Sequence, residues 1–371
     1  MNNSPARIGA LIGLALAVLT LPAVDWLNRP SRQEAPAGPV VLSDCDGAIR
    51  ELVIHYVAEA APMVETAYRD FLTQLPGDVI VHVVCPDDDA FNDLRRRIGA
   101  TACSLYSVPT GHPMTCWSRD RWLALAPVSD QEPVVLLAPA RESGESVWPA
   151  RRGDMQTPFD LDDALGERCR ALRAGFEFDG GDFVIDTRTA FVTPEVQRRN
   201  AIPPDELTRL LEQILRRDVA LLPDAPPHHA GMFMMLAGDD TVAVGDPSLA
   251  QALIEPNELP LAAPDFSAAT QARFDAVAQF CERQGYHVVR MPVIPDADGR
   301  TWLTWLNAIL DQRDGRRIVY MPSYRGLERL NDVAARVWNE HLYCEVRPID
   351  CTGVYPCFGT LRCLVNVLRR E

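Results

Sequence analysis

The stretch "GTLRCLVNV" (residues 359–367) lies close to the C-terminal end of this 371-residue sequence and sets Cys363 in an apolar run. A run of this kind is typical of a β-strand. A cysteine in such a run is most often buried filler, but it can also be half of a disulfide or a nucleophile. Which of these applies depends on the polar residues that the other segments of the chain place beside it.

Outward from this stretch, short strand-like runs alternate with amphipathic segments. Runs typical of strands include "DVIVHVVC" (78–85), "DFVIDTRTAFVT" (182–193), "DTVAVGDP" (240–247) and the final "LRCLVNVL". Helices are expected over residues 87–99, 203–218, 268–285 and 329–342. The alternation predicts an α/β fold built from strand–helix–strand units, and the hairpins between them favour mixed rather than all-parallel sheets.

The composition limits the classes of function. The 47% share of hydrophobic residues suits a globular protein with a sizeable core. The net charge of −15 makes nucleic acid an unsuitable partner and favours cationic ligands. All 36 basic residues are arginine, so Schiff-base lysine chemistry and a P-loop nucleotide site are excluded.

The N-terminal segment, residues 1–27, predicts export. One early charge precedes an apolar run over residues 8–24, which fits a signal peptide or an uncleaved membrane anchor equally well. Residues 28–40 are rich in proline and polar residues and form a predicted linker. Residues 41–371 then form one catalytic-type domain in a periplasmic, extracellular or membrane-anchored protein, with membrane attachment, if any, through residues 8–24.

Ten cysteines fit an oxidising compartment, where most of them are expected to be disulfide-bonded. Cys351 and Cys357 would close a short loop, but sequence does not fix the connectivity. C-x-x-C and H-E-x-x-H spacings are both missing from the sequence, so neither a metal site nor a cofactor is indicated.

Four polar motifs interrupt the apolar runs. Taken singly, each has an ordinary structural explanation, as a surface ion pair, a turn, a structural histidine or a core cysteine. Their combination in this order favours a functional site. The motif residues are Arg119 and Asp120 in "CWSRDRW", Asp179 and Asp182 in "FEFDGGDFVID", His229 in "PPHHAGMFMML", and Cys363.

These segments resemble those of the guanidino-group-modifying enzymes, which include peptidylarginine deiminases, agmatine and arginine deiminases, dimethylargininases and amidinotransferases. "AFVTPEVQRRN", "WLTWLNAIL", "RRIVYMPSYRG" and the C-terminal "CLVNVLRR" support the resemblance, which covers roughly residues 50–371. It implies a pentein fold, an α/β propeller of five ββαβ-type units around a pseudo-fivefold axis, with the site in the central channel.

The resemblance also implies roles for the motif residues. Cys363 would attack the central carbon of a guanidino group, because a thiolate is a strong nucleophile. His229 would protonate the departing ammonia, and water would then hydrolyse the thiouronium intermediate to a ureido product. Asp179 would orient His229, as a triad carboxylate does. Asp120, with Asp182 and Arg119, would bind the substrate, which is an arginine-containing peptide or a small guanidine.

Four positions depart from the family pattern. Asp179 stands for the glutamate of the E-G-G turn, and Val365 stands for the usual threonine two residues after the cysteine. Gly231 stands where the H-x-D motif has its substrate-binding aspartate, and Arg362 stands before the cysteine, where histidine is usual. Loss of a carboxylate that faces a buried cation costs about 2–5 kcal/mol of binding. The sequence therefore leaves two functions open: an exported deiminase-like hydrolase, or a catalytically inactive pentein that binds a ligand or partner.

Overall fold

The last strand, β18 (Val365–Arg370), pairs antiparallel with β2 (Ile49–His55), so the end of the chain joins a sheet near its beginning. The structure is a computed structural model that describes residues 38–129, 131–140, 149–254 and 261–371. Residues Pro39–Glu371 form one compact unit. The stretch 8–24 lies outside the described residues, so export and membrane attachment through it stay predictions.

The described residues form five sheets, and each contains both parallel and antiparallel pairs, as the hairpins of the sequence predict. The first sheet has the order β18-β2-β3-β4, with β3 (Ile80–Cys85) and β4 (Ser104–Pro109). The second is β1 (Val40–Val41), β5 (Leu123–Ala126), β6 (Val134–Ala138) and β7 (Cys169–Arg173), and the third is β10 (Asp218–Leu221), β9 (Thr189–Val192) and β8 (Phe183–Ile185). The fourth is β11 (Met234–Gly238), β12 (Thr241–Asp246), β13 (His287–Pro295) and β14 (Trp302–Thr304), and the fifth is β15 (Ile309–Arg313), β16 (Arg316–Ser323) and β17 (Cys344–Asp350).

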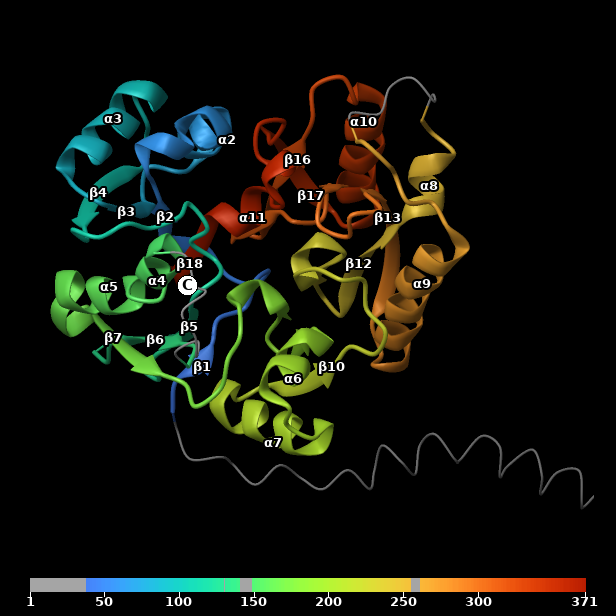
Figure 1. Cartoon of the computed structure of the whole chain (residues 1–371), viewed down its shortest axis with the longest axis horizontal. Helices are drawn as coiled ribbons and strands as arrows, with labels where there is room; N and C mark the ends of the chain where they lie inside the picture. The colour runs from blue at the N-terminus through green and yellow to red at the C-terminus, as the bar shows by residue number, and fades with distance from the viewer. Residues whose placement is uncertain (1–37, 130, 141–148, 255–260) are drawn as a thin grey trace, which may run out of the picture. The chain divides into compact units, whose positions relative to one another are not determined.

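A helix connects one parallel pair of strands in every sheet, because parallel neighbours need a crossover connection. These helices are α2 (Ala61–Gln74), α5 (Thr157–Leu165), α7 (Pro204–Leu215), α9 (Ala268–Arg283) and α10 (Glu328–Arg336). The others are α3 (Asp88–Ile98), α4 (Pro149–Asp154), α6 (Pro194–Asn200), α8 (Pro247–Gln251) and α11 (Leu361–Leu364). In Figure 1 most helices lie toward the periphery, whereas α11 and β18 lie nearer the middle.

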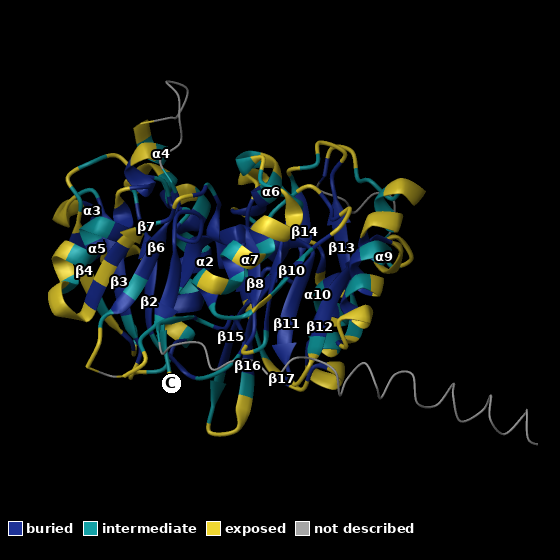
Figure 2. Ribbon diagram, turned by 90° about the horizontal axis from the view of Figure 1, so that it is seen from below, coloured by how far each residue is buried: buried dark blue, intermediate teal, exposed yellow. Residues whose placement is uncertain are grey.

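The helix boundaries follow ordinary end signals. The side chain of Asp87 accepts a hydrogen bond from the Ala90 amide at 2.8 Å and caps α3, and Gly99 ends that helix at φ 77°. The helices predicted over 87–99, 203–218 and 268–285 are confirmed. Figure 2 shows that exposed residues gather on the outer faces of the helices, while the strands are largely buried.

The segment around Cys363 differs from the prediction. The apolar run "LRCLVNVL" was expected to be one strand, but residues 361–364 form the single turn α11, and the strand begins at Val365. The Cys363 amide donates to the Thr360 carbonyl at 3.1 Å, which closes the turn. The amide of Arg362 donates to the carbonyl of Asn307 at 3.0 Å and holds the turn against the preceding sheet.

The structure does not support the expected disulfides. All ten cysteines lie within the described residues and are unpaired, and only Cys357 is exposed. Most of the others sit inside hydrophobic clusters, where a free cysteine packs as a small apolar residue. Cys351 is buried whereas Cys357 is exposed, so their short separation in sequence does not lead to a bond. Among the described helices, none has the length and apolar character needed to cross a bilayer.

One buried carboxylate, Asp44, connects the segments that carry the candidate site. Arg362 of α11 donates to both of its oxygens at 2.9 Å, and the Ile185 amide of β8 donates to one at 2.8 Å. Arg119, which precedes β5, lies 3.3 Å from it. Burial alone would raise the pKa of Asp44, but the attraction of Arg362 and Arg119 outweighs it, so the pKa lies below its usual value.

Asp44→Asn tests this connection. Removing one charge of a buried pair leaves the charges of the arginines uncompensated. The free energy of unfolding is therefore expected to fall by about 3–5 kcal/mol. The control is Asp239→Asn, because Asp239 pairs with Arg317 but is 81% exposed, and surface pairs contribute only about 0–1 kcal/mol. Urea unfolding followed by tryptophan fluorescence measures both. Equal midpoints for the two variants would contradict the role of Asp44.

Candidate active site

A cleft of about 560 Å³ brings together three of the six predicted site residues, Asp120, His229 and Cys363. Asp120 lies before β5, His229 directly precedes the 3-10 turn Ala230–Met232, and Cys363 is on α11. The other residues that line the cleft are Met63, Thr115, Trp117, Arg151, Arg300, Pro356, Cys357 and Phe358. The motifs therefore meet in space although they are far apart in the sequence.

His229 is surrounded by acidic groups. Its Nε2 lies 3.6 Å from Asp179 Oδ2, and its Nδ1 lies 3.9 Å from Asp120 Oδ1. Burial alone would lower the pKa of His229, but its contacts with Asp179 and the Cys363 thiol, together with the charge of Asp120, raise that pKa well above the usual value. The imidazole is therefore protonated at neutral pH and can donate a proton.

The D-G-G-D turn fixes Asp179 against this histidine. The amide of Asp179 donates to the side chain of Asp182 at 2.9 Å, and the two form a reciprocal capping box around the turn Gly180–Asp182. A side chain at Gly181 would place its Cβ 2.4 Å from His229 Nδ1, so only glycine lets the imidazole lie this close to the turn.

Asp182 is held by hydrogen bonds within the protein. It is buried, and besides the Asp179 amide its oxygens accept hydrogen bonds from Thr193 Oγ1 at 3.0 Å and Arg199 at 3.1 Å. It is not among the cleft-lining residues, so its expected role in binding substrate gains no support from its position.

Cys363 receives a hydrogen bond that the sequence did not predict. Asn307 Nδ2 donates to the sulfur at 3.1 Å and to Thr360 Oγ1 at 2.7 Å. Asn307 is buried, which fixes the direction of its amide group. The sequence indicates this role only through the position of Asn307, a polar amide residue inside the apolar run "WLTWLNAIL".

Arg119 and Arg362, the two arginines next to motif residues, point away from the cleft. Arg119 is buried and donates to Asn366 at 3.0 Å; burial and the nearby charge of Arg362 lower its pKa to about 10. Arg362 is held by Asp44 and by the carbonyl of Phe183 at 2.8 Å. Neither Arg119 nor Arg362 is therefore among the residues that line the cleft, so the expected role of Arg119 in binding substrate gains no support from its position.

Two of the departures from the family pattern, Gly231 and Arg362, lie next to each other in the structure. A Cβ at Gly231 would lie 2.7 Å from Asn307 Oδ1 and 2.9 Å from Arg362 Nη1. The guanidinium of Arg362 therefore occupies the space into which a side chain at position 231 would point. An aspartate there would need Arg362 and Asn307 to move, so restoring the carboxylate alone does not restore the family site.

Arg151, on α4, is a further cleft residue that the sequence did not indicate. Its Nη1 donates to Asp120 Oδ2 at 2.7 Å, and its Nη2 lies 3.6 Å from Asp179 Oδ1. Those carboxylates, with Asp154 at 3.5 Å, raise the pKa of Arg151 against the opposing effect of burial. No motif marks Arg151, because α4 reaches the cleft only through tertiary packing.

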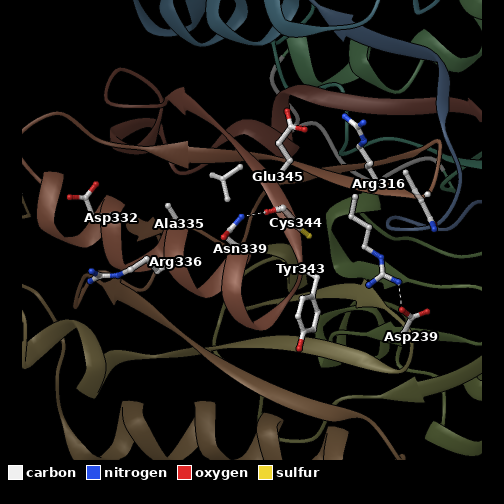
Figure 3. A pocket seen from close by; sticks show the side chains of 13 residues that line it. Asp239, Arg316, Asp332, Ala335, Arg336, Asn339, Tyr343, Cys344 and Glu345 are labelled. Atoms are coloured by element: carbon white, nitrogen blue, oxygen red, sulfur yellow. Dashed lines mark hydrogen bonds and ion pairs between the residues drawn. The ribbon is translucent and has the colours of Figure 1, made fainter.

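A larger groove of about 1330 Å³ lies elsewhere, against β16, β17 and α10. Figure 3 shows arginines, carboxylates and Tyr343 around it. Its described lining includes no histidine, and burial raises the pKa of its one cysteine, Cys344, to about 12. The groove therefore lacks a nucleophile with an acid partner. Among the described residues, no cluster of three or more histidine, cysteine or acidic side chains is arranged to hold a metal ion.

Comparison with solved structures identifies the fold. An agmatine deiminase of C. jejuni, a cysteine-to-serine variant with substrate bound, is 13% identical with a TM-score of 0.69 over 91% of this chain and 100% of that one. An agmatine deiminase of Enterococcus faecalis is 14% identical with a TM-score of 0.66 over 90% of this chain and 96% of that one. Comparisons with protein-family models and with curated proteins gave no match.

The structural neighbours are members of the pentein superfamily, as the resemblance of the motifs implied. The chain has the α/β fold of these guanidino-group-modifying enzymes. At such low identity the likeness shows the fold, and the chemistry has to be argued from the cleft itself.

Gly181→Ala tests the close approach of His229 to the D-G-G-D turn. The added methyl group should displace the imidazole from Asp179 and so return the pKa of His229 toward its ordinary value. The matched control is Gly175→Ala, since a Cβ at Gly175 meets no atom within 4 Å. Histidine NMR titration measures the pKa in each variant. An unchanged pKa of His229 in Gly181→Ala would show that the turn does not position it.

Proposed function

We propose that this protein is a guanidino-group hydrolase in which Cys363 is the nucleophile, His229 the acid–base group and Asp179 the carboxylate that orients it. One observation carries the proposal: Cys363, His229 and Asp120 line a single cleft, with an amide donor on the sulfur and a carboxylate beside the imidazole. These are the groups required for attack on an amidine-type carbon.

The reaction balances with these residues alone. The Cys363 thiolate adds to the central carbon of the guanidino group, the bond to one nitrogen breaks, and His229 gives its proton to the departing ammonia. His229 then accepts a proton from water as that water attacks the thiouronium carbon. The carbon–sulfur bond breaks and restores the thiolate, the remaining hydroxyl proton passes to solvent, where it is taken up by the released ammonia, and the neutral ureido product leaves. The raised pKa of His229 suits the first step, in which it must donate.

Aromatic side chains are suited to contact the apolar chain of a substrate whose guanidino group enters the cleft. Trp117 and Phe358 line it, and Phe358 is 41% exposed with the guanidinium of Arg300 4.0 Å from its ring centroid. Aromatic side chains at a mouth can pack along an alkyl chain. Both expected substrates, an arginine side chain of a peptide and a small guanidine, have such a chain, and we keep both in the proposal.

We also infer that the five sheets are the five ββαβ-type units of the α/β propeller. The support is the helix that crosses between parallel strands in each of the five sheets. In that arrangement the cleft belongs to the central channel, where the superfamily places its site.

A second candidate function is ligand binding without turnover. Gly231 supplies no carboxylate, and Arg362 fills the space beside it, so the cleft has lost one family contact to a substrate cation. A protein of this kind would bind a guanidine or a related group and release it unchanged.

Product analysis separates the two candidates. The wild type, incubated with arginine peptides, free arginine and agmatine, is expected to release ureido product and ammonia in equal amounts. Cys363→Ser should lose this activity by roughly a thousandfold or more, since a hydroxyl is a much weaker nucleophile here. Ureido product is measured colorimetrically and ammonia enzymatically. Binding of a guanidine with no product from the wild type would instead establish the second candidate.

Asp179→Asn tests the acid group through the pH dependence of kcat/KM. Asp179 raises the pKa of His229, so wild-type activity should persist through neutral pH and fall only as the pH rises past that raised value. Without the Asp179 charge the pKa of His229 falls, and the alkaline limb should move to lower pH. Asp239→Asn, an exposed change outside the cleft, should leave the profile in place. An alkaline limb at the same pH in Asp179→Asn would exclude His229 as the acid.

A further inference from the structure

We infer that Arg151 occupies the position of the substrate cation in the cleft and thereby determines its selectivity, competing with any guanidinium or amidinium that enters. The inference rests on the proposed function, because it assigns Asp120 to the substrate cation. The inference gives Arg151 a role that the proposed function does not contain, which is to repel and compete with substrates that carry a guanidinium.

The contacts of Arg151 are those that a bound guanidinium would make. One of its nitrogens donates to Asp120 at 2.7 Å, and the other lies 3.6 Å from Asp179. It lines the same cleft as His229 and Cys363. A planar cation with forked donors is the natural partner of these carboxylates, whether it belongs to a ligand or to the protein.

The oxygens of Asp179 and Asp182 already have arginines beside them, although Asp179 Oδ1 is buried and accepts no hydrogen bond. Asp179 Oδ1 lies 3.2 Å from Arg121, and its Oδ2 lies 3.3 Å from Arg199. Asp182 binds Arg199 and Thr193 within the protein, as described above. Asp120 Oδ1 lies 3.9 Å from the imidazole of His229.

The charges consequently balance without a ligand. Four carboxylates, Asp120, Asp154, Asp179 and Asp182, face Arg121, Arg151, Arg199 and the imidazole of His229. The Cys363 thiolate of the proposed mechanism and Arg300, which also line the cleft, add one charge of each sign. A further cation would enter beside Arg151 with no carboxylate to itself, and like charges at such a distance repel. A neutral ligand is not repelled by the charge of Arg151.

Arg151 is held in the cleft by its own helix. Three residues further along α4, Asp154 is fully buried and accepts hydrogen bonds from the Thr115 amide at 2.8 Å and the Thr115 hydroxyl at 2.6 Å. Arg151 itself keeps 22% of its side chain exposed. The backbone of α4 is thus anchored, while the guanidinium reaches the cleft from the solvent side.

Paired alkylating reagents test the inference. Chloroacetamidine is a cation and chloroacetamide its neutral counterpart, so the ratio of their rates at Cys363 reports the preference of the cleft for a cation. In Arg151→Gln that ratio should rise roughly tenfold or more, since about 1.4 kcal/mol of lost repulsion corresponds to tenfold. The experiment uses a Cys357→Ser background, because Cys357 is the other thiol that lines the cleft. Mass spectrometry of the Cys363 peptide gives both rates.

Matched variants separate charge from structure. Arg152→Gln makes the same change on an exposed neighbour in α4 and should leave the ratio within about twofold of the wild type, a difference well under 1 kcal/mol. Arg151→Lys keeps the charge and should also resemble the wild type. Arg151→Met replaces Arg151→Gln if the latter does not fold. An unchanged ratio in the folded neutral variants, with Cys363 labelled by both reagents, would overturn the inference and leave the proposed function intact.

A binding measurement covers the case in which Cys363 reacts with neither reagent. That result would contradict the nucleophile but not the role of Arg151. Isothermal titration of agmatine into wild-type protein and Arg151→Gln then decides. Affinity that rises about tenfold in Arg151→Gln supports the inference, and equal affinity, or no agmatine binding by either protein, overturns it.

Discussion

Asp44 is the carboxylate on which the arrangement of the cleft depends. It precedes β2 in the chain, yet it holds Arg362 of α11, the Ile185 amide of β8 and the guanidinium of Arg119. The residues that follow these partners in sequence include Cys363 and Asp120. Because its partners are buried with it, the charge of Asp44 cannot be replaced by water, and the segments are fixed relative to one another. A single interaction outside the cleft therefore positions two groups inside it.

Adjacent residues in the motifs face opposite sides, one toward the buried network around Asp44 and the other toward the cleft. Arg119 and Arg362 face the buried network, while their neighbours Asp120 and Cys363 face the cleft. The turn of α11 produces this division at the C-terminal end of the chain, where a continuous strand had been expected. In the D-G-G-D segment, Asp182 caps the turn internally, and Asp179 is left to contact His229. In three of the four motifs, one residue supports the fold and the other lies in the cleft or contacts His229.

The sequence predicted the parts whose signals are local. Caps and periodicity located α3, α7 and α9, and the four motifs contained the three residues that line the cleft. It did not predict which of two adjacent motif residues faces the cleft, because that depends on the backbone direction at Arg119 and at Arg362. Asn307 and Arg151 reach the site through packing between distant segments, and neither has a local pattern that marks it. The expected disulfides failed for a related reason, since a cysteine count says nothing of where each thiol is buried.

Catalysis and substrate recognition are physically separable in this cleft. In the proposed mechanism the reactivity of Cys363 depends on Asn307 and His229, both of which contact it. Recognition of a cation depends on carboxylates that remain free, and here Gly231 supplies none while Arg151 takes Asp120. The first set of contacts is that of a nucleophilic enzyme, and the second is that of a site already filled by its own arginine. Under the function and the inference proposed above, the cleft combines the reacting groups of a guanidino-group hydrolase with an arginine of the protein that competes for the position of the substrate cation.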